Sequence, residues 1–263
     1  MKNYIRQKQI LEHLSTHDIL SVNDAVVLFG VSPATVRRDF TELAASGSVK
    51  RICGGIARNI VDQAEPQPFI LREKWYSAEK RFLAAQLFKY IQEAKTIFID
   101  GGTTTAHLGM FLKNPEQAVI TNSVPLCNIV SEMFPAGGGA AVYMTGGRFN
   151  PTGSLLLGSN AEAAVAKYHA DVAVISVRGI DENGLYNHNE DIAAIGRTMI
   201  ANADKTVVIA DHSKIGQRAM NKVSPLSSIE ALFTVETNEN RMLINKIRKS
   251  GIKVFCENPF NLL

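Results

Sequence analysis

The segment Asp100-Gly101-Gly102-Thr103-Thr104-Thr105 combines several groups that favour an anion. It ends a short apolar run at 96–100 and precedes a helical pattern, so we expect it at a strand-to-helix turn. Glycines let a ligand approach the backbone, while free N–H groups, threonine hydroxyls and the helix dipole attract negative charge. The segment has neither the Gly-Lys-Ser/Thr of a P-loop nor the three glycines of a dinucleotide fingerprint. It predicts an anion site, although such turns are also common as plain tight connections.

Three further polar segments follow apolar runs that are typical of buried strands. They are Thr121-Asn122-Ser123, Gly146-Gly147-Arg148 and Asp211-His212-Ser213-Lys214-Ile215-Gly216. Parallel sheets bind ligands outside the carboxyl ends of their strands, so all four segments are expected to converge on one crevice. Lys214 would place a cation against a phosphate, and Asp100 and Asn122 would orient hydroxyls. Each short motif taken singly is an ordinary turn.

A basic helical face lies near the N-terminus, within residues 32–45. Val36, Phe40 and Leu43 recur at i, i+4 and i+7, which assigns them to the buried side of a helix. The opposite side carries Ala34, Arg38 and Thr41, with Arg37 on its flank. Such a face fits the major groove of DNA, where an arginine fork reaches guanine O6 and N7. The alternative is a solvated face, the usual role of adjacent arginines on a helix.

The elements around this face favour DNA binding. Residues 3–16 have a helical pattern, and Ser21 to Asp24 form a capping box for a second short helix that ends at Gly30. Ser32-Pro33 then caps the basic helix, which gives a helix-turn-helix. Strands at 48–52 and 56–60 predict a basic hairpin, so the whole is a winged helix-turn-helix. The residues expected to contact DNA are Ser32, Pro33, Ala34, Thr35, Arg37, Arg38, Thr41, Lys50, Arg51 and Arg58.

The rest of the chain predicts a doubly wound, mostly parallel α/β domain. Short, nearly continuous apolar runs alternate with helical patterns. The strands are expected at 96–100, 118–121, 140–145, 171–176, 206–211, 231–235 and 253–256. Two prolines and a lack of periodicity mark residues 61–69 as a linker. The predicted domains are therefore 1–60 for DNA binding, 61–69 as linker and 70–263 as the α/β domain.

Composition agrees with an ordinary globular protein of 263 residues, 46% hydrophobic and 20% charged. Residues 1–60 hold eight Lys and Arg against five Asp and Glu, so the net charge of +3 lies in this first quarter. No secretory signal or membrane-spanning run is present, and three widely spaced cysteines indicate reduced thiols, so we expect a cytoplasmic protein. No His and Cys spacing fits a metal site, and no cofactor is expected.

Two stretches of the N-terminal region resemble the helix-turn-helix signature of the DeoR family of sugar-catabolism regulators. They are Val31-Ser32-Pro33-Ala34-Thr35-Val36-Arg37-Arg38-Asp39-Phe40 and Gly47-Ser48-Val49-Lys50-Arg51-Ile52-Cys53-Gly54-Gly55. Phe40 replaces the usual leucine, and Cys53 replaces a histidine of the wing. The four polar segments of the α/β region resemble the sensor domain of the same family in their order.

This resemblance implies a sensor fold similar to ribose-5-phosphate isomerase and a phosphorylated sugar as effector. In a loop that usually reads Gly-x-x-Gly, this chain has Arg178, which places a charge beside the expected pocket; Gly196 replaces a basic residue often found before Arg197. The residues expected to bind the effector are Asp100, Gly101, Gly102, Thr103, Thr104, Thr105, Thr121, Asn122, Ser123, Gly146, Gly147, Arg178, Asp211 and Lys214.

The function that follows is a DNA-binding repressor of carbohydrate-utilisation genes whose affinity for double-stranded operator DNA depends on a sugar phosphate. A homo-oligomer, dimer or higher, is expected because one helix-turn-helix reads one half-site. The alternative is a sugar-phosphate isomerase-like enzyme with an accessory helical domain, since fold does not fix function. The exposed arginines and basic hairpin favour the repressor and no catalytic residue is assigned. A purely structural adaptor function would explain neither the basic N-terminal face nor the polar segments of the α/β region.

Overall fold

The structure of this chain is a computed structural model that describes residues 2–14, 17, 19–45, 48–58 and 67–257. The chain divides into two compact units between Ser77 and Ala78. Most of the predicted linker, residues 61–66, lies outside the described part, and its last residue begins a helix, α4. The domain limits proposed from the sequence therefore stay predictions.

The first unit is a winged helix-turn-helix, as predicted. Its elements are α1 (Lys2–Leu14), β1 (Ile19–Ser21), α2 (Val22–Phe29), α3 (Pro33–Ala45), β2 (Val49–Ile52), β3 (Gly55–Arg58) and α4 (Phe69–Lys74). Ser21 accepts a hydrogen bond from the N–H of Asp24, and Gly30 ends α2 in the left-handed conformation with φ of 61°. The hairpin is a three-stranded sheet in the order β1-β3-β2, because the short strand β1, not expected from the sequence, pairs with β3.

A buried ion pair joins the first and third helices of this unit. The Arg6 guanidinium on α1 donates from Nε and Nη2 to the Asp39 carboxylate on α3, and the Asp39 side chain is 2% exposed. The hydrogen bond to Asp39 raises the pKa of Arg6. Phe40, the neighbour of Asp39, lies in the apolar core of the unit. The pair therefore fixes which side of α3 faces inward, and thereby which side faces outward.

The second unit is a doubly wound α/β domain. Among the described residues, seven parallel strands form one sheet in the order β15-β14-β12-β9-β4-β5-β6. Its elements are α5 (Ser77–Ile91), β4 (Thr96–Ile99), η1 (Thr105–Met110), β5 (Ala118–Thr121), α6 (Val124–Met133), β6 (Ala141–Met144), β7 (Arg148–Asn150), β8 (Leu155–Leu157), α7 (Ser159–Val165), β9 (Ala170–Ser176), β10 (Gly179–Asp181), β11 (Gly184–Asn187), α8 (Glu190–Ala201), β12 (Ala203–Ile209), η2 (His212–Lys214), β13 (Asn221–Ser224), η3 (Leu226–Ser228), β14 (Ala231–Phe233), α9 (Arg241–Lys249) and β15 (Lys253–Phe255).

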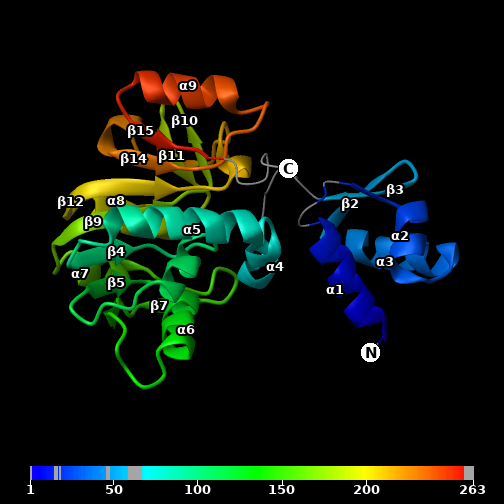
Figure 1. The fold of residues 1–263 in the computed structure, drawn as a ribbon, viewed down its shortest axis with the longest axis horizontal. Coiled ribbons are helices and arrows are strands. Elements are labelled where there is room, and N and C mark those ends of the chain that lie inside the picture. Colours follow the sequence, from blue (N-terminus) through cyan, green and yellow to red (C-terminus); the bar gives the residue numbers. More distant parts are fainter. Residues whose placement is uncertain (1, 15–16, 18, 46–47, 59–66, 258–263) are drawn as a thin grey trace. The chain divides into compact units, whose positions relative to one another are not determined.

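Each face of this sheet has its own apolar core. On one face Ile97 and Ile99 pack with α5, which crosses the sheet in Figure 1, and with η1 and α6. On the other face Phe98 packs with α7, α8 and α9. Alternate residues of a buried strand point to opposite faces, so continuous apolar strands are what a sheet covered on both sides requires. All seven predicted strands are confirmed.

The direction of winding reverses between β4 and β9. The chain proceeds from β4 through β5 to β6 at one edge, then returns to β9 beside β4 and proceeds through β12 and β14 to β15. The strands on either side of this switch point send their connections to opposite faces, and open α/β sheets bind ligands at the carboxyl ends of the strands there. Asp100 directly follows β4, so the fold places it at the switch point.

Two smaller antiparallel sheets were not expected. One is the hairpin β7-β8, and the other has the order β10-β11-β13. Among the described residues, no helix is long and apolar enough to cross a membrane.

Candidate functional site

The outward face of α3 carries the residues predicted to read DNA. Ser32, Pro33, Ala34, Arg37, Arg38 and Thr41 are exposed and Thr35 is half-buried, whereas Val36, Phe40 and Leu43 are buried. The Arg38 Nε donates to the Glu42 carboxylate at 3.2 Å, so the two residues form an ion pair across one turn of the helix. The Arg37 side chain meets no acidic group among the described residues. Both guanidiniums therefore remain accessible to a ligand.

The wing presents a second basic surface. Lys50 and Arg51 of β2 are exposed, as is Cys53 at the turn, where Gly54 has φ of 78°. A Cβ on Gly55 would lie 2.4 Å from the carbonyl oxygen of Leu20, so only glycine lets β1 pack against the hairpin. Arg58 ends β3, and its side chain lies outside the described residues.

In the second unit, the predicted effector segments follow five neighbouring strands at one edge of the sheet. Across the order β12-β9-β4-β5-β6, these strands lead into Asp211, Arg178, Asp100, Asn122 and Gly146 in turn. Because all five strands are parallel, their carboxyl ends lie at the same edge. The fold thus brings together segments more than one hundred residues apart in sequence.

Asp100 is the buried centre of this edge. Its carboxylate accepts hydrogen bonds from the Ser176 N–H at 2.9 Å and the Ser176 hydroxyl at 3.2 Å. Burial raises the pKa of Asp100 to about 7, although hydrogen bonds from Ser176 and Thr105 act in the opposite direction. A carboxyl group with this pKa exchanges a proton near neutrality, so it can both accept and donate hydrogen bonds. Ser176 was not singled out in the sequence.

Asn122 has an unused acceptor beside Asp100. Its amide nitrogen donates to the carbonyl oxygen of Leu156 at 3.3 Å, whereas its Oδ1 is buried with no hydrogen-bond partner among the described residues. A buried polar atom without a partner costs free energy that a ligand hydroxyl or a water would recover. Asn122 therefore has one atom free for a ligand.

Several neighbouring hydroxyls already hold the local structure. Thr105 donates to the carbonyl oxygen of Gly102 at 3.1 Å, and the Thr121 hydroxyl accepts from the N–H of Ser123. Ser123 in turn caps α6 by accepting from the N–H of Leu126. Thr103 and Thr104 are buried as well. Of the polar groups at this edge, Asp100 and Asn122 most clearly retain hydrogen-bonding capacity for a ligand.

The two glycines have a packing role that the sequence did not reveal. A Cβ on Gly101 would lie 1.8 Å from Leu155 Cδ2, and one on Gly102 would lie 2.2 Å from Ser176 Oγ. The glycines thus make room for side chains of the protein itself, and the expected approach of a ligand to their backbone stays a prediction. The predicted helix after this turn is wrong in kind, since η1 is a six-residue 3-10 helix. Its short length weakens the helix-dipole argument for an anion there.

The hairpin β7-β8 packs against this part of the edge. Leu155 fills the space beside Gly101, and the Leu156 N–H donates to the carbonyl oxygen of Asn122 at 2.9 Å. Gly147 has φ of 106° and no room for a Cβ, because Leu157 and Ala161 lie against it. At Gly146, with φ of 68°, the surroundings are open. No local pattern in the sequence indicated that this hairpin contacts Gly101 and Asn122.

The other end of this edge is cationic. Burial alone would raise the pKa of Asp211, but Lys214 and Lys80 lower it to about 2, with Ser213 and His212 acting in the same direction. Burial lowers the pKa of Arg178, which Asp211 partly offsets. The cations at this end of the edge, Lys80, Arg178 and Lys214, thus outnumber its two buried carboxylates, Asp211 and Glu79.

Lys80 is a member of this cluster that the sequence did not reveal. It lies near the start of α5 and is only 2% exposed. Burial, with Lys80 and Arg81, also lowers the pKa of His107 to about 4, so that imidazole is neutral at pH 7. Next to Lys80, the Glu79 carboxylate accepts from the His212 N–H and contacts His212 Nδ1, both at 2.7 Å. A lysine on a helix is ordinarily solvated, so its sequence carried no signal of burial.

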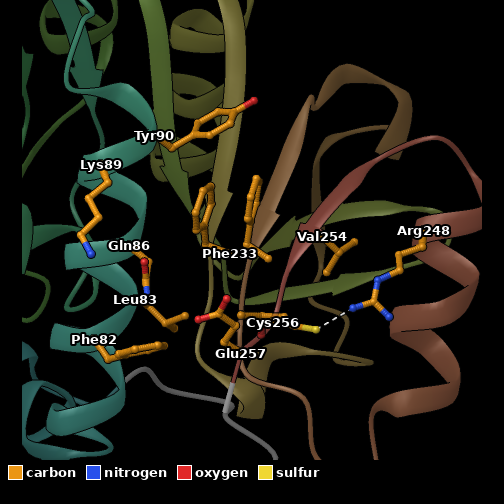
Figure 2. A pocket seen from close by; sticks show the side chains of 12 residues that line it. Phe82, Leu83, Gln86, Lys89, Tyr90, Phe233, Arg248, Val254, Cys256 and Glu257 are labelled. Carbon is orange, nitrogen blue, oxygen red and sulfur yellow. Dashed lines mark hydrogen bonds between the residues drawn. The ribbon is translucent and has the colours of Figure 1, made fainter. Parts of the chain in front are cut away.

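A cavity of about 590 Å³ lies elsewhere on this unit, between α5 and the strands β14 and β15 (Figure 2). Phe82 and Tyr90 of α5, with Phe233 and Phe255 of the strands, supply its apolar lining, and the Arg248 guanidinium contacts Cys256 beside it. No predicted effector residue lines this cavity. It therefore does not support the effector assignment.

Two family models match this chain. The DeoR-like helix-turn-helix domain matches residues 6–60, and the DeoR C terminal sensor domain matches residues 76–236. The chain therefore belongs to the DeoR family of transcriptional regulators. This result confirms the resemblance, and it favours a regulator over the isomerase-like enzyme.

Curated proteins that match this chain along most of their length are named transcriptional repressors. The putative aga operon transcriptional repressor of Escherichia coli O157:H7 is 29% identical over 95% of this chain and 92% of its own. The repressor CsqR of Escherichia coli K12 is 31% identical, covering 88% of this chain and 87% of its own. The glycerol-3-phosphate regulon repressor of Haemophilus influenzae is 27% identical, with 97% and 98% covered.

Among solved structures, ribose 5-phosphate isomerase A from Methanocaldococcus jannaschii aligns with 53% of this chain and 54% of its own. The identity is 16% and the TM-score 0.38. At that score the likeness carries no argument about function.

The raised pKa of Asp100 predicts a pH-dependent stability. A carboxyl with a pKa of 3.8 in the unfolded chain and about 7 in the folded one favours folding while protonated. Its contribution is fully present below about pH 4 and is lost as the pH rises through about 7. Asp100→Asn stays neutral, so between pH 4 and pH 8 its stability should improve relative to wild type by up to about 4 kcal/mol.

Urea unfolding followed by circular dichroism at several pH values measures this difference. Glu93→Gln, in the exposed turn that follows α5, is the control and should show no comparable trend. A constant difference between Asp100→Asn and wild type across this range would contradict the assignment.

Proposed function

We propose that this regulator represses carbohydrate-utilisation genes and that a phosphorylated sugar, bound at the strand ends around Asp100, controls its affinity for operator DNA. The proposal is supported by the distribution of groups along the strand ends: Asp100 and Asn122 offer hydrogen-bond acceptors at one end, and the other end carries the cations Arg178, Lys80 and Lys214. A sugar phosphate has the same division, with hydroxyls on one part and charge on the other. On this proposal the protein acts in the cytoplasm, where both DNA and sugar phosphates are present.

The predicted ligand contacts follow from the chemistry of each group. Lys214 would bind the phosphate, since a charge-assisted hydrogen bond is stronger than a neutral one. Asp100 and the Oδ1 of Asn122 would accept hydrogen bonds from sugar hydroxyls. Because Asp100 and Asn122 are almost fully buried, we expect ligand entry to require a local rearrangement of the segments packed against them, among them the hairpin β7-β8. The ligand would alter DNA binding only if it prefers one arrangement of the protein over another.

On the DNA side, α3 would enter the major groove and the wing would lie along the phosphates. Arg37 and Arg38 are exposed on the outward face of α3, and Arg51 projects from β2. Arginine is suited to guanine because its fork donates two parallel hydrogen bonds, whereas Lys50 and Arg51 on a strand suit the backbone.

Substitutions on α3 and on the wing should affect DNA binding in different ways. Arg37→Ala or Arg38→Ala should cost about 1–3 kcal/mol in specific binding if that residue reads a base. Lys50→Ala or Arg51→Ala should weaken specific and non-specific binding alike and reduce the salt slope by about 1. Gel-shift titrations with a fragment selected by the wild-type protein, and with a scrambled fragment, measure both.

Arg241→Ala is the control, since it also removes one exposed arginine but lies on α9. Normal binding by all four DNA-unit variants would show that α3 and the wing do not contact the operator.

The effector contact is tested at Lys214. Lys214→Ala removes a charge-assisted contact of about 1.5–3 kcal/mol, so it should weaken the sugar phosphate roughly ten- to a hundredfold. The unphosphorylated sugar should bind far more weakly than its phosphate to the wild-type protein. Calorimetry with matched pairs of sugars and sugar phosphates gives both affinities.

Lys113→Ala, an exposed lysine on the same unit, serves as the control and should bind the phosphate normally. DNA binding without ligand should survive the Lys214 change. Equal affinity for the sugar and its phosphate, or unchanged phosphate binding by Lys214→Ala, would overturn this site.

A further inference from the structure

The outer edge of β6 is open. β6 is the last strand of the seven-stranded sheet, and its inner side pairs with β5. The N–H groups of Ala141 and Thr145 donate to Gln117 and Thr121 on the β5 side. Successive residues of a strand point their N–H and C=O groups to opposite sides. Those of Val142 and Met144 therefore point outward, where no described residue meets them.

Large apolar side chains of β6 are exposed at this edge. Tyr143 and Met144 are each 47% exposed, and the Tyr143 ring lies 6.1 Å from that of Tyr168. Exposed apolar side chains beside unpaired backbone groups are what pairing with another strand would bury.

Nothing in β6 protects the edge from pairing. Natural edge strands commonly carry a lysine, a proline or a bulge that prevents association. The sequence Ala141-Val142-Tyr143-Met144 has none of these, and its register with β5 is regular. The opposite edge strand, β15, differs because it begins with Lys253, which is ion-paired with Glu230 at 2.9 Å. Of the two edges of the sheet, the β6 edge is the one built for association.

We propose that two copies of this chain associate through β6, which pairs antiparallel with β6 of the second copy about a two-fold axis. Val142 exchanges two backbone hydrogen bonds with Met144 of the second copy, and Met144 does the same with Val142. The axis then passes between the two Tyr143 residues, which face each other as a non-hydrogen-bonded pair. The two seven-stranded sheets become one continuous sheet.

A second copy fits this edge better than an unrelated partner. A two-fold axis brings each residue close to its own counterpart, so like charges near the axis would repel; β6 carries no charge. The first unit offers a single α3, whereas helix-turn-helix proteins bind paired half-sites as dimers. The proposal does not depend on the identity of the effector or on the site around Asp100.

Sedimentation equilibrium of the full chain tests the interface. Wild type should have twice the monomer mass of 28.7 kDa at micromolar concentration. Val142→Pro removes an outward N–H without disturbing the bonds to β5, and Met144→Lys places like charges beside the axis. Each should weaken self-association at least roughly tenfold. Met220→Lys, at a residue 92% exposed elsewhere on the unit, should leave it unchanged.

Disulfide trapping tests the register. In a Cys53→Ser background, which removes the exposed cysteine, Tyr143→Cys should form a covalent dimer on mild oxidation. Directly opposed residues of a non-hydrogen-bonded pair lie about 4.5 Å apart at Cα, within disulfide range. Trapping together with weakened Val142→Pro and Met144→Lys dimers supports the proposal. A monomeric wild type, or a dimer that both substitutions leave intact and Tyr143→Cys does not trap, would overturn it.

Discussion

The function of this chain depends on one constraint, that every strand of its main sheet runs in the same direction. Parallel strands place all their carboxyl ends at one edge, so residues after β4, β5, β6, β9 and β12 become neighbours. Parallel strands must also be connected by crossovers, which cover both faces and make the strands continuously apolar. At the switch point, Asp100 after β4 accepts hydrogen bonds from Ser176 at the end of β9. That contact joins the two halves of the sheet at the proposed ligand site.

A buried polar contact also orients helix α3 of the DNA-binding unit. Arg6 and Asp39 form a buried pair that fixes the inner side of α3, and the outer side then presents Arg37 and Arg38. In both units a buried charged group holds an element in position. Removing one partner of a buried pair leaves the other uncompensated, so such contacts specify geometry strongly even where their net stabilisation is small.

Much of this fold could be predicted from the sequence because its signals are local. Apolar runs such as 118–121 are long enough for a strand and too short for a helix, and caps such as Ser21 and Gly30 mark helix ends. The missed strands are three or four residues long. A turn signal, Asp181-Glu182-Asn183-Gly184, does precede β11, and Asp181 accepts hydrogen bonds there from the N–H groups of Asn183 and Gly184.

The candidate site was predictable only in outline. Asp100, Asn122 and Lys214 follow strands and are polar, so their common location could be inferred from the strand-end rule alone. What Gly101 and Gly102 make room for depends on Leu155 and Ser176, which are more than fifty residues away in sequence. The burial of Lys80 depends on Asp211, which lies in another part of the chain. Such pairings are set by tertiary packing, which no local pattern contains.

The central claim is that the strand-end site and the operator are coupled. Coupling between two ligands is reciprocal, so a sugar phosphate that changes operator affinity by some factor must itself bind with affinity changed by that factor when operator is present. The direct measurement is operator affinity, by fluorescence anisotropy, with and without a saturating sugar phosphate, together with calorimetry of that sugar phosphate on the free protein and on the operator complex. The account predicts the same factor, different from one, in both measurements. Operator affinity that no sugar phosphate in a broad panel alters would contradict it.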